Sequence, residues 1–131
     1  MIGLDTNVLL RLIERSDKAQ TARAETLIRI NGIEGSFINA IVLCEYTWTL
    51  QRTYKFSREA IVQCIEQLLE ASEFVVQSRE SVMAALTNFQ SGKADFADCM
   101  LAEINQVAGC FATFTFDEDA ANSAGFRSMP A

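Results

Sequence analysis

The stretch MIGLDTNVLLRLIER, residues 1–15, decides how the chain is organised. Met1–Leu4 is a short apolar run typical of a buried strand, and the apolar residues between Val8 and Ile13 recur at the spacing of one helical face. Asp5 therefore stands at the carboxyl end of a strand and the start of a helix. Because removing an ionised carboxylate from water is costly, we expect Asp5 to cap the helix, pair with a cation, be protonated or bind a metal.

The same alternation of apolar strands and amphipathic helices continues along the chain. Further strands are expected at residues 35–39, 73–78, 110–116 and, at a sheet edge, 126–129. Helices are expected at residues 17–30, 40–54, 57–72, 80–92 and 95–109, with a short helical turn in the tail. In the first of these helices we expect the inward residues to be Ala19, Ala22, Leu27, Ile28 and Ile30.

Strands separated by helices pair in parallel through right-handed crossovers. The predicted fold class is therefore α/β, with three α/β/α layers around a central, mainly parallel sheet of four to five strands. A length of 131 residues is close to the commonest domain size, so residues 1–131 are expected to form a single domain.

The composition limits the chemistry. No histidine is present, which excludes Ser-His and Cys-His nucleophilic systems and histidine-ligated zinc. Hydrolysis would then depend on carboxylates and on a metal that lowers the pKa of water. No C-x-x-C spacing occurs, and the cysteines are expected to be reduced, mostly buried thiols: Cys44, Cys64, Cys99 and Cys110.

The charge distribution is uneven. A formal charge of −6 argues against a surface that coats nucleic acid, because phosphate affinity comes mainly from Lys and Arg. Residues 1–60 nevertheless hold eight of the eleven basic residues, which is compatible with a basic rim beside an acidic site. No apolar stretch approaches a membrane span and no secretory signal is recognisable, so we expect a cytoplasmic protein without a membrane partner.

Glu45 is the least expected charged residue in the chain. It is the only charged side chain between Glu34 and Arg52, and its apolar neighbours predict that it is buried. An alternative is that it lies on a solvated helix face or pairs with an arginine.

Three aspartates in the second half of the chain stand near predicted element ends. Asp95 and Asp98 are three residues apart, which places both on nearly the same face at a helix N-terminus, although Asp95 could serve only as an N-cap. Asp117 follows the predicted strand at 110–116, as Asp5 follows the first strand, although its acidic neighbours are also typical of a solvated turn.

Ligands of open α/β sheets bind beyond the carboxyl ends of the strands, so Asp5 and Asp117 are expected to lie there together. Several carboxylates in one place raise one another's pKa values unless cations occupy the cluster. Mg²⁺ fits this donor set, with Mn²⁺ as the alternative, because hard ions take oxygen ligands and accept phosphate oxygens. One or two such ions could activate water for attack on phosphorus.

The motifs, in their order along the chain, resemble those of PIN-domain ribonucleases, and among these the short VapC-type toxins of type II toxin-antitoxin pairs. They are DTN after the first strand, a lone Glu in the third helix, DFADCMLA at 95–102 and TFDED at 115–119. The resemblance extends from Met1 to about Phe126. It implies a three-layer PIN-like fold and a Mg²⁺-dependent endoribonuclease that acts as a toxin.

The resemblance also implies roles for individual residues. The catalytic, metal-binding quartet would be Asp5, Glu45, Asp98 and Asp117, with Asp95 as a neighbouring ligand. Supporting residues would be Thr6 and Asn7, which orient Asp5 and the substrate phosphate, and Thr115, which stabilises the site by hydrogen bonding. Candidates for RNA contact are Arg11, Arg15, Arg52, Lys55, Arg58 and Lys93.

The partners implied are an RNA substrate and a cognate antitoxin that inserts a peptide, often through an arginine, into the acidic pocket. A homodimer is typical of the family, and higher toxin-antitoxin assemblies also occur. The apolar face around Tyr46, Trp48 and Phe56 would either hold the antitoxin or pack in the core.

Two other functions remain open from the residues alone. Asp5 could be the nucleophile of a phosphatase or phosphotransferase, but DTN lacks a second Asp two residues later and Lys93 is a weak candidate for the accompanying lysine. A non-catalytic, receiver-like module would use its acids only to bind Mg²⁺ or to cap helices. Cleavage of RNA by the purified protein with Mg²⁺ would distinguish the nuclease from both.

Overall fold

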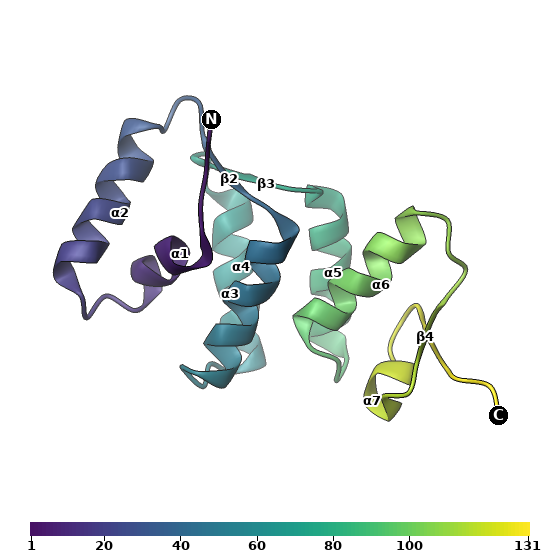
Figure 1. Ribbon diagram of the computed structural model, residues 1–131. Helices are drawn as coiled ribbons and strands as arrows, with labels where there is room; N and C mark the ends of the chain where they lie inside the picture. Colours follow the sequence, from purple (N-terminus) through teal and green to yellow (C-terminus); the bar gives the residue numbers. More distant parts are fainter.

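The computed structural model describes all residues from Met1 to Ala131 and alternates strands with helices (Figure 1). The strands are β1 Ile2–Gly3, β2 Ser36–Ile38, β3 Phe74–Val76, β4 Thr113–Thr115 and β5 Phe126–Ser128. The helices are α1 Thr6–Ile13, α2 Lys18–Ile30, α3 Ala40–Arg52, α4 Arg58–Glu70, α5 Arg79–Ser91, α6 Phe96–Val107 and α7 Glu118–Ala121. The predicted α/β class is confirmed. None of these helices has the length and apolar character needed to cross a membrane.

Most helices begin directly after a residue whose side chain caps them. This is why the helix starts agree closely with those predicted from the sequence. A side-chain oxygen of the residue before the helix accepts a hydrogen bond from a backbone N–H of the first turn, which would otherwise lack a partner. This holds for every helix except α5, and the capping residues are Asp5, Asp17, Asn39, Ser57, Asp95 and Asp117.

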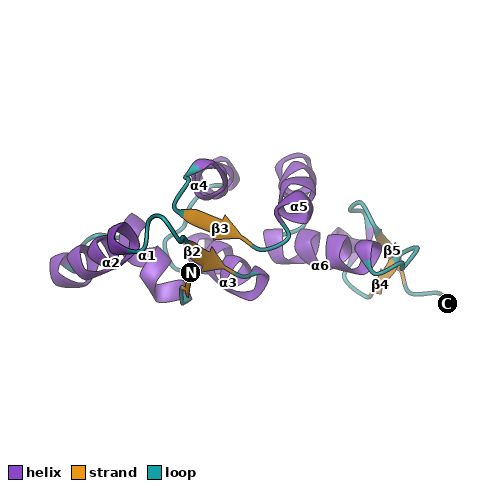
Figure 2. Cartoon of the chain, turned by 90° about the horizontal axis from the view of Figure 1, so that it is seen from above, coloured by secondary structure: helices purple, strands orange, loops and turns teal.

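The strands form two separate parallel sheets instead of the single sheet of four to five strands that was expected. One sheet has the order β1-β2-β3 and the other pairs β4 with β5. Helix α6 packs against α5 and α3 and leads the chain away from β1, so that β4 and β5 lie beyond these helices (Figure 2). Both β1 and β4 are consequently edge strands.

The apolar core is divided in the same way. The main cluster of 24 buried residues includes Leu4, directly after β1, and side chains from β2, β3 and helices α1 to α6. A small second cluster, Ala102, Ala120 and Phe126, joins α6 to the segment 113–128, which we call the C-terminal unit and which contains β4, α7 and β5. The C-terminal unit is therefore attached to the rest of the chain mainly through α6.

The inward face of α2 differs from the prediction. Its buried residues are Thr21, Ala24 and Ile28, whereas Ala19 and Ala22 are exposed. Leu27 and Ile30 are 41% and 74% exposed. The reason is that α2 packs against α1, so the apolar stripe that the sequence provides is only partly covered.

The cysteines are all free, as predicted, and they differ in burial. Cys64 and Cys99 are buried, Cys44 is half-buried and Cys110 is exposed. Burial, followed by the charge of Asp95, raises the pKa of both Cys44 and Cys99 to about 11, so these thiols stay protonated at neutral pH.

Arg58 holds the turn between α5 and α6. Its guanidinium donates hydrogen bonds to the carbonyl oxygens of Phe89 at 2.8 Å, Ala94 at 2.9 Å and Lys93 at 3.1 Å. It also lies 4.2 Å from the ring centroid of Phe89. Since this turn precedes Asp95, Arg58 fixes the position of the first turn of α6.

Replacing Arg58 by alanine is expected to lower the free energy of unfolding by about 2–4 kcal/mol, because three carbonyl groups lose a charged donor and Phe89 loses its cation. Urea unfolding measures the loss. The matched control is Arg52→Ala, which removes only the stacking of an exposed guanidinium over Trp48 and should cost about 1 kcal/mol or less. Equal losses for the two variants would contradict this role of Arg58.

Candidate functional site

Asp5 and Glu45 are linked through Thr6 at the start of α1. The Oδ1 atom of Asp5 accepts a hydrogen bond from the Thr6 backbone N–H at 2.8 Å. The Thr6 hydroxyl, which is buried, donates to Oε1 of Glu45 at 3.3 Å. The first strand and the third helix thus bring two of the expected acids together, and we call Asp5 and Glu45 the N-terminal pair.

The prediction that Glu45 is buried is wrong. Helix α3 turns Val42, Leu43, Tyr46 and Leu50 into the core, and this orientation leaves Glu45 exposed on the opposite face. Glu45 borders an open groove of about 370 Å³ between α3 and α6, whose other lining residues are mostly apolar.

The apolar face that was expected either to hold a partner or to pack in the core mainly does the latter. Tyr46 is buried and Phe56 is partly buried against the main core. Trp48 alone is exposed, with Arg52 stacked 5.0 Å from its ring centroid.

Asp95, Asp98 and Asp117 form a second group, which we call the C-terminal acids. Asp95 caps α6 by accepting the Asp98 backbone N–H at 2.8 Å. Asp117 caps α7 by accepting the backbone N–H groups of Asp119 at 2.9 Å and Ala120 at 3.1 Å. Thr115 accepts the Asp117 backbone N–H at 3.0 Å, so its hydroxyl helps to fix the end of β4.

The pKa of Asp98 shows that the C-terminal acids act on one another. Burial raises this pKa, and the charges of Asp95 and Asp117 raise it further. Asp117 therefore lies within electrostatic range of Asp98, although one belongs to α6 and the other to the start of α7. A cation placed among these carboxylates would relieve the repulsion.

Capping leaves each aspartate able to bind a second partner. Asp5, Asp95 and Asp117 all accept their backbone hydrogen bonds through Oδ1, and Oδ2 forms no hydrogen bond within the chain. The cap fixes the carboxylate at the helix N-terminus and leaves one oxygen for a cation. Capping and metal binding are thus compatible in these residues.

The donor chemistry suits Mg²⁺, but the placement within one chain does not complete a site. All donors are carboxylate oxygens, and no histidine competes for a softer metal. No three acidic or cysteine side chains approach closely enough to hold a metal ion. Asp5 follows β1 of one sheet, whereas Asp117 follows β4 of the other.

Several of the basic residues expected to contact RNA already have partners. Arg11 lies 3.7 Å from Glu14 and donates a 3.4 Å hydrogen bond to Tyr54, and Arg15 pairs with Glu25. Arg58 is bound to three carbonyl groups. The remaining candidates are exposed and form no ion pair: Arg52, Lys55 and Lys93.

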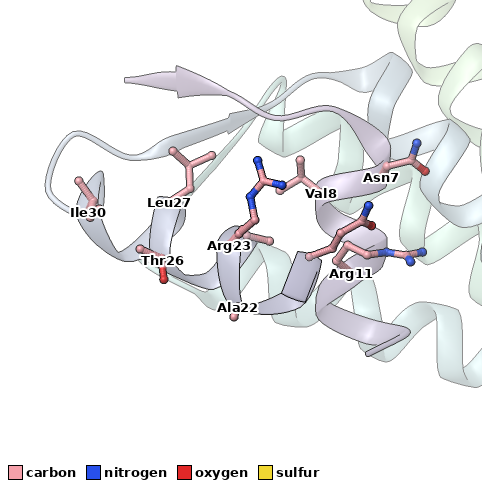
Figure 3. A pocket seen from close by; sticks show the side chains of 10 residues that line it. Asn7, Val8, Arg11, Ala22, Arg23, Thr26, Leu27 and Ile30 are labelled. Atoms are coloured by element: carbon pink, nitrogen blue, oxygen red, sulfur yellow. The ribbon is translucent and has the colours of Figure 1, made fainter. Parts of the chain in front are cut away.

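A second groove, which the sequence did not predict, lies between α1 and α2. It has a volume of about 700 Å³ and is lined by apolar side chains together with Asn7, Arg11 and Arg23. Figure 3 shows Val8, Leu27 and Arg23 among the side chains that line this groove. Leu27 and Ile30, the apolar residues of α2 that remain uncovered, were the signal in the sequence that could have revealed it.

Asp117→Asn is expected to lower the pKa of Asp98, because the variant removes a nearby negative charge while asparagine keeps the helix cap. Carboxyl-detected NMR titration measures this pKa. The matched control, Asp119→Asn, removes an adjacent acid that does not act on Asp98, and it should leave the value unchanged. An unaltered Asp98 pKa in Asp117→Asn would mean that the two acids lie apart in solution.

The same shift predicts a pH effect on stability. Since the pKa of Asp98 is higher in the folded chain than in the unfolded chain, this carboxyl favours folding at low pH, and that contribution is lost as the pH rises through the folded value. Without metal, Asp98→Asn should therefore raise the melting temperature at pH 7 and have little effect near pH 3. A lower melting temperature at pH 7 would contradict the crowding of these acids.

Comparison with known families agrees with the α/β fold. A model of the PIN domain family matches residues 2–125. No curated protein matches the chain significantly. PIN domains are generally Mg²⁺-dependent nucleases, and the match covers nearly the whole chain. The chain therefore belongs to the PIN domain family.

Proposed function

We propose that this PIN domain is a Mg²⁺-dependent endoribonuclease that acts as the toxin of a toxin-antitoxin pair. The observation that carries the proposal is the equivalent placement of Asp5 and Asp117. Each follows a parallel strand, caps the next helix with Oδ1 and keeps Oδ2 free. Asp98, with its raised pKa, adds a carboxylate that a cation would stabilise in its charged form.

The protein groups around these acids would prepare the site for an ion and for RNA. The ligands would be Asp5, Glu45, Asp98 and Asp117, with Asp95 beside them. Mg²⁺, or Mn²⁺ in its place, would supply a water of lowered pKa and charge stabilisation at phosphorus. Thr6 would help to orient Glu45 by donating to it, and Thr115 would hold the backbone at Asp117.

The RNA would be held by contacts with its phosphate backbone on the side of α1 and the α3–α4 connection. Arg23 lines the groove between α1 and α2 together with Asn7, which comes two residues after Asp5, and with Arg11, whose guanidinium also contacts Glu14 and Tyr54. The exposed Arg52 and Lys55 follow α3. With a net charge of −6, binding would depend on such local groups and would weaken steeply as salt increases.

A cognate antitoxin would inhibit the enzyme by inserting an arginine among the carboxylates. A guanidinium is the natural bidentate partner of a carboxylate and would take the place of the cation. The groove between α3 and α6, which is apolar and borders Glu45, would suit the adjoining residues of such a peptide. In this proposal residues 1–131 act as one domain in the cytoplasm and assemble as a homodimer or in larger complexes with the antitoxin.

The proposal predicts loss of RNA cleavage when the acids are neutralised. Asp5→Asn, Asp98→Asn and Asp117→Asn should each reduce Mg²⁺-dependent cleavage of total cellular RNA by at least about 100-fold, because a metal contributes several kcal/mol to the transition state. Asparagine keeps the caps at positions 5 and 117, so the fold should be preserved.

The matched control is Asp17→Asn. Asp17 caps α2 through the same type of hydrogen bond but lies outside the acidic groups, so this variant should cleave RNA as fast as the unaltered protein. Full activity of all three aspartate variants, or cleavage that persists in EDTA, would contradict the proposed nuclease. Mapping RNA 5′ ends after induction in cells would identify the substrate RNA.

A further inference from the structure

Trp48 is the only tryptophan of the chain, and it lies on the surface. Its side chain is 48% exposed, whereas Tyr46 and Leu50 on the same helix are buried. A single exposed apolar side chain is common and needs no explanation by itself. The groups around Trp48 therefore decide what the ring can bind.

Trp48 lies in a row of exposed side chains on α3. Helical residues spaced three and four apart share one face, and Glu45, Trp48 and Arg52 follow this spacing. With a rise of about 1.5 Å per residue, Trp48 lies about 4.5 Å along the helix axis from Glu45, and Arg52 lies about 6 Å beyond Trp48. The exposed face of α3 thus presents an acid, an aromatic ring and a cation in succession.

Trp48 also adjoins the C-terminal acids. Helix α3 packs against α6, and Trp48, Asp95 and Ala97 line one small depression. Asp95 is held there as the cap of α6, since it accepts the Asp98 backbone N–H at 2.8 Å. One aromatic side chain is therefore next to Asp95 and one helical turn from Glu45.

Two cations without acidic partners lie at the end of this row. Arg52 and Lys55 are exposed, and neither forms an ion pair. The Phe56 backbone N–H donates to the Leu50 carbonyl at 2.9 Å, which keeps the turn that carries Lys55 against the end of α3. In a chain with a net charge of −6, these cations form a local site for phosphate groups.

The ring of Trp48 already stacks with a planar group. The guanidinium carbon of Arg52 lies 5.0 Å from its ring centroid, so a face of the ring is open to planar partners. Both side chains are exposed, and a cation–π contact at an exposed site is weak. A nucleobase could take the place of the guanidinium and release it to bind a phosphate.

We propose that Trp48 stacks on a nucleobase of the bound RNA, next to the phosphate at the acidic site, and that Arg52 and Lys55 bind the phosphates that follow. Stacking of bases on aromatic rings and pairing of phosphates with cations are the two contacts that hold single-stranded nucleic acid. This inference rests on the proposed nuclease function and adds the residues that position its substrate. A peptide bearing an arginine fits this surface less well, because Arg52 and Lys55 would repel it.

Fluorescence of the unaltered protein tests the stacking directly, because indole emission comes from Trp48 alone. Stopped-flow mixing with Mg²⁺ and a short unpaired RNA oligonucleotide should quench this emission saturably before any product forms. The control is an oligonucleotide of the same length with abasic riboses, which keeps the phosphates and lacks the bases. It should quench far less.

Substitutions at position 48 separate stacking from packing. Trp48→Leu keeps an apolar side chain and removes the aromatic face, so KM for the RNA should rise about 5- to 100-fold, the effect of losing one base–aromatic stack, while kcat changes little. Trp48→Phe should recover most of the loss. Circular dichroism shows that both variants are folded. Equal KM values for Trp48→Leu and the unaltered protein would contradict the stacking.

Salt dependence tests the phosphate contact of Arg52. Arg52→Ala should raise KM and reduce the slope of log KM against log salt concentration by about 0.7, the value for one phosphate contact in a single strand. The matched control is Arg29→Ala, which removes an exposed arginine of α2 that forms no ion pair and should leave the slope unchanged. An unchanged slope in Arg52→Ala would remove Arg52 from the proposal.

The fluorescence outcome is independent of cleavage and so separates this inference from the proposed function. Quenching by the unpaired RNA in a protein that cleaves no RNA would support the stacking and refute the nuclease. Absence of quenching, or equal quenching by the abasic oligonucleotide, would overturn the stacking whether or not the RNA is cleaved. Loss of binding to a protein partner in Trp48→Leu, with KM for RNA unaltered, would overturn it as well.

Discussion

Backbone groups at the edge of a parallel strand need hydrogen-bond partners, and β1 meets this requirement on one side only. β1 pairs with β2 on one side and is open at Gly3 on the other. Asp5 follows directly, so whatever pairs with β1 also decides which groups approach Asp5. The open edge of β4, which leads to Asp117 in the same way, has the complementary requirement. Each of these aspartates thus stands at the carboxyl end of a strand whose outer edge is unpaired.

The acidic residues cap helices and, in the proposed site, also bind a cation. Asp5, Asp95 and Asp117 each satisfy helix N-termini that would otherwise be unpaired, and the helix dipole favours their negative charge. This stabilises the carboxylates as individuals. Burial raises the pKa of Asp98, and the charges of Asp95 and Asp117 raise it further, so the accumulation of acids there is unfavourable. A cation resolves this conflict without breaking a cap, because only one oxygen of each carboxylate is engaged. The threonines next to Asp5 and before Asp117 extend the same network by one hydrogen bond each.

The sequence predicted the features that depend on local interactions. The order of strands and helices, the cap at Ser57 and the stops near Gly92 and Gly109 follow from periodicity and from the chemistry of helix ends. Three features depend on packing between distant segments and were not predictable: the division of the sheet, the exposure of Glu45 and the uncovered side of α2. Leu27 and Ile30 illustrate this limit. Their apolar character predicts burial, but burial also requires another segment to pack over them, and both side chains are exposed. Arg58 shows the converse, since its three carbonyl partners are more than 30 residues away in sequence.

The most direct test of the central claim is the anomalous diffraction of Mn²⁺ in crystals of the unaltered protein. The proposed nuclease site predicts an anomalous peak at the Oδ2 atom of Asp5, with Asp98 and Asp117 among the other ligands. An ordered Mn²⁺ elsewhere, with Asp5 and Asp117 unliganded, would contradict it.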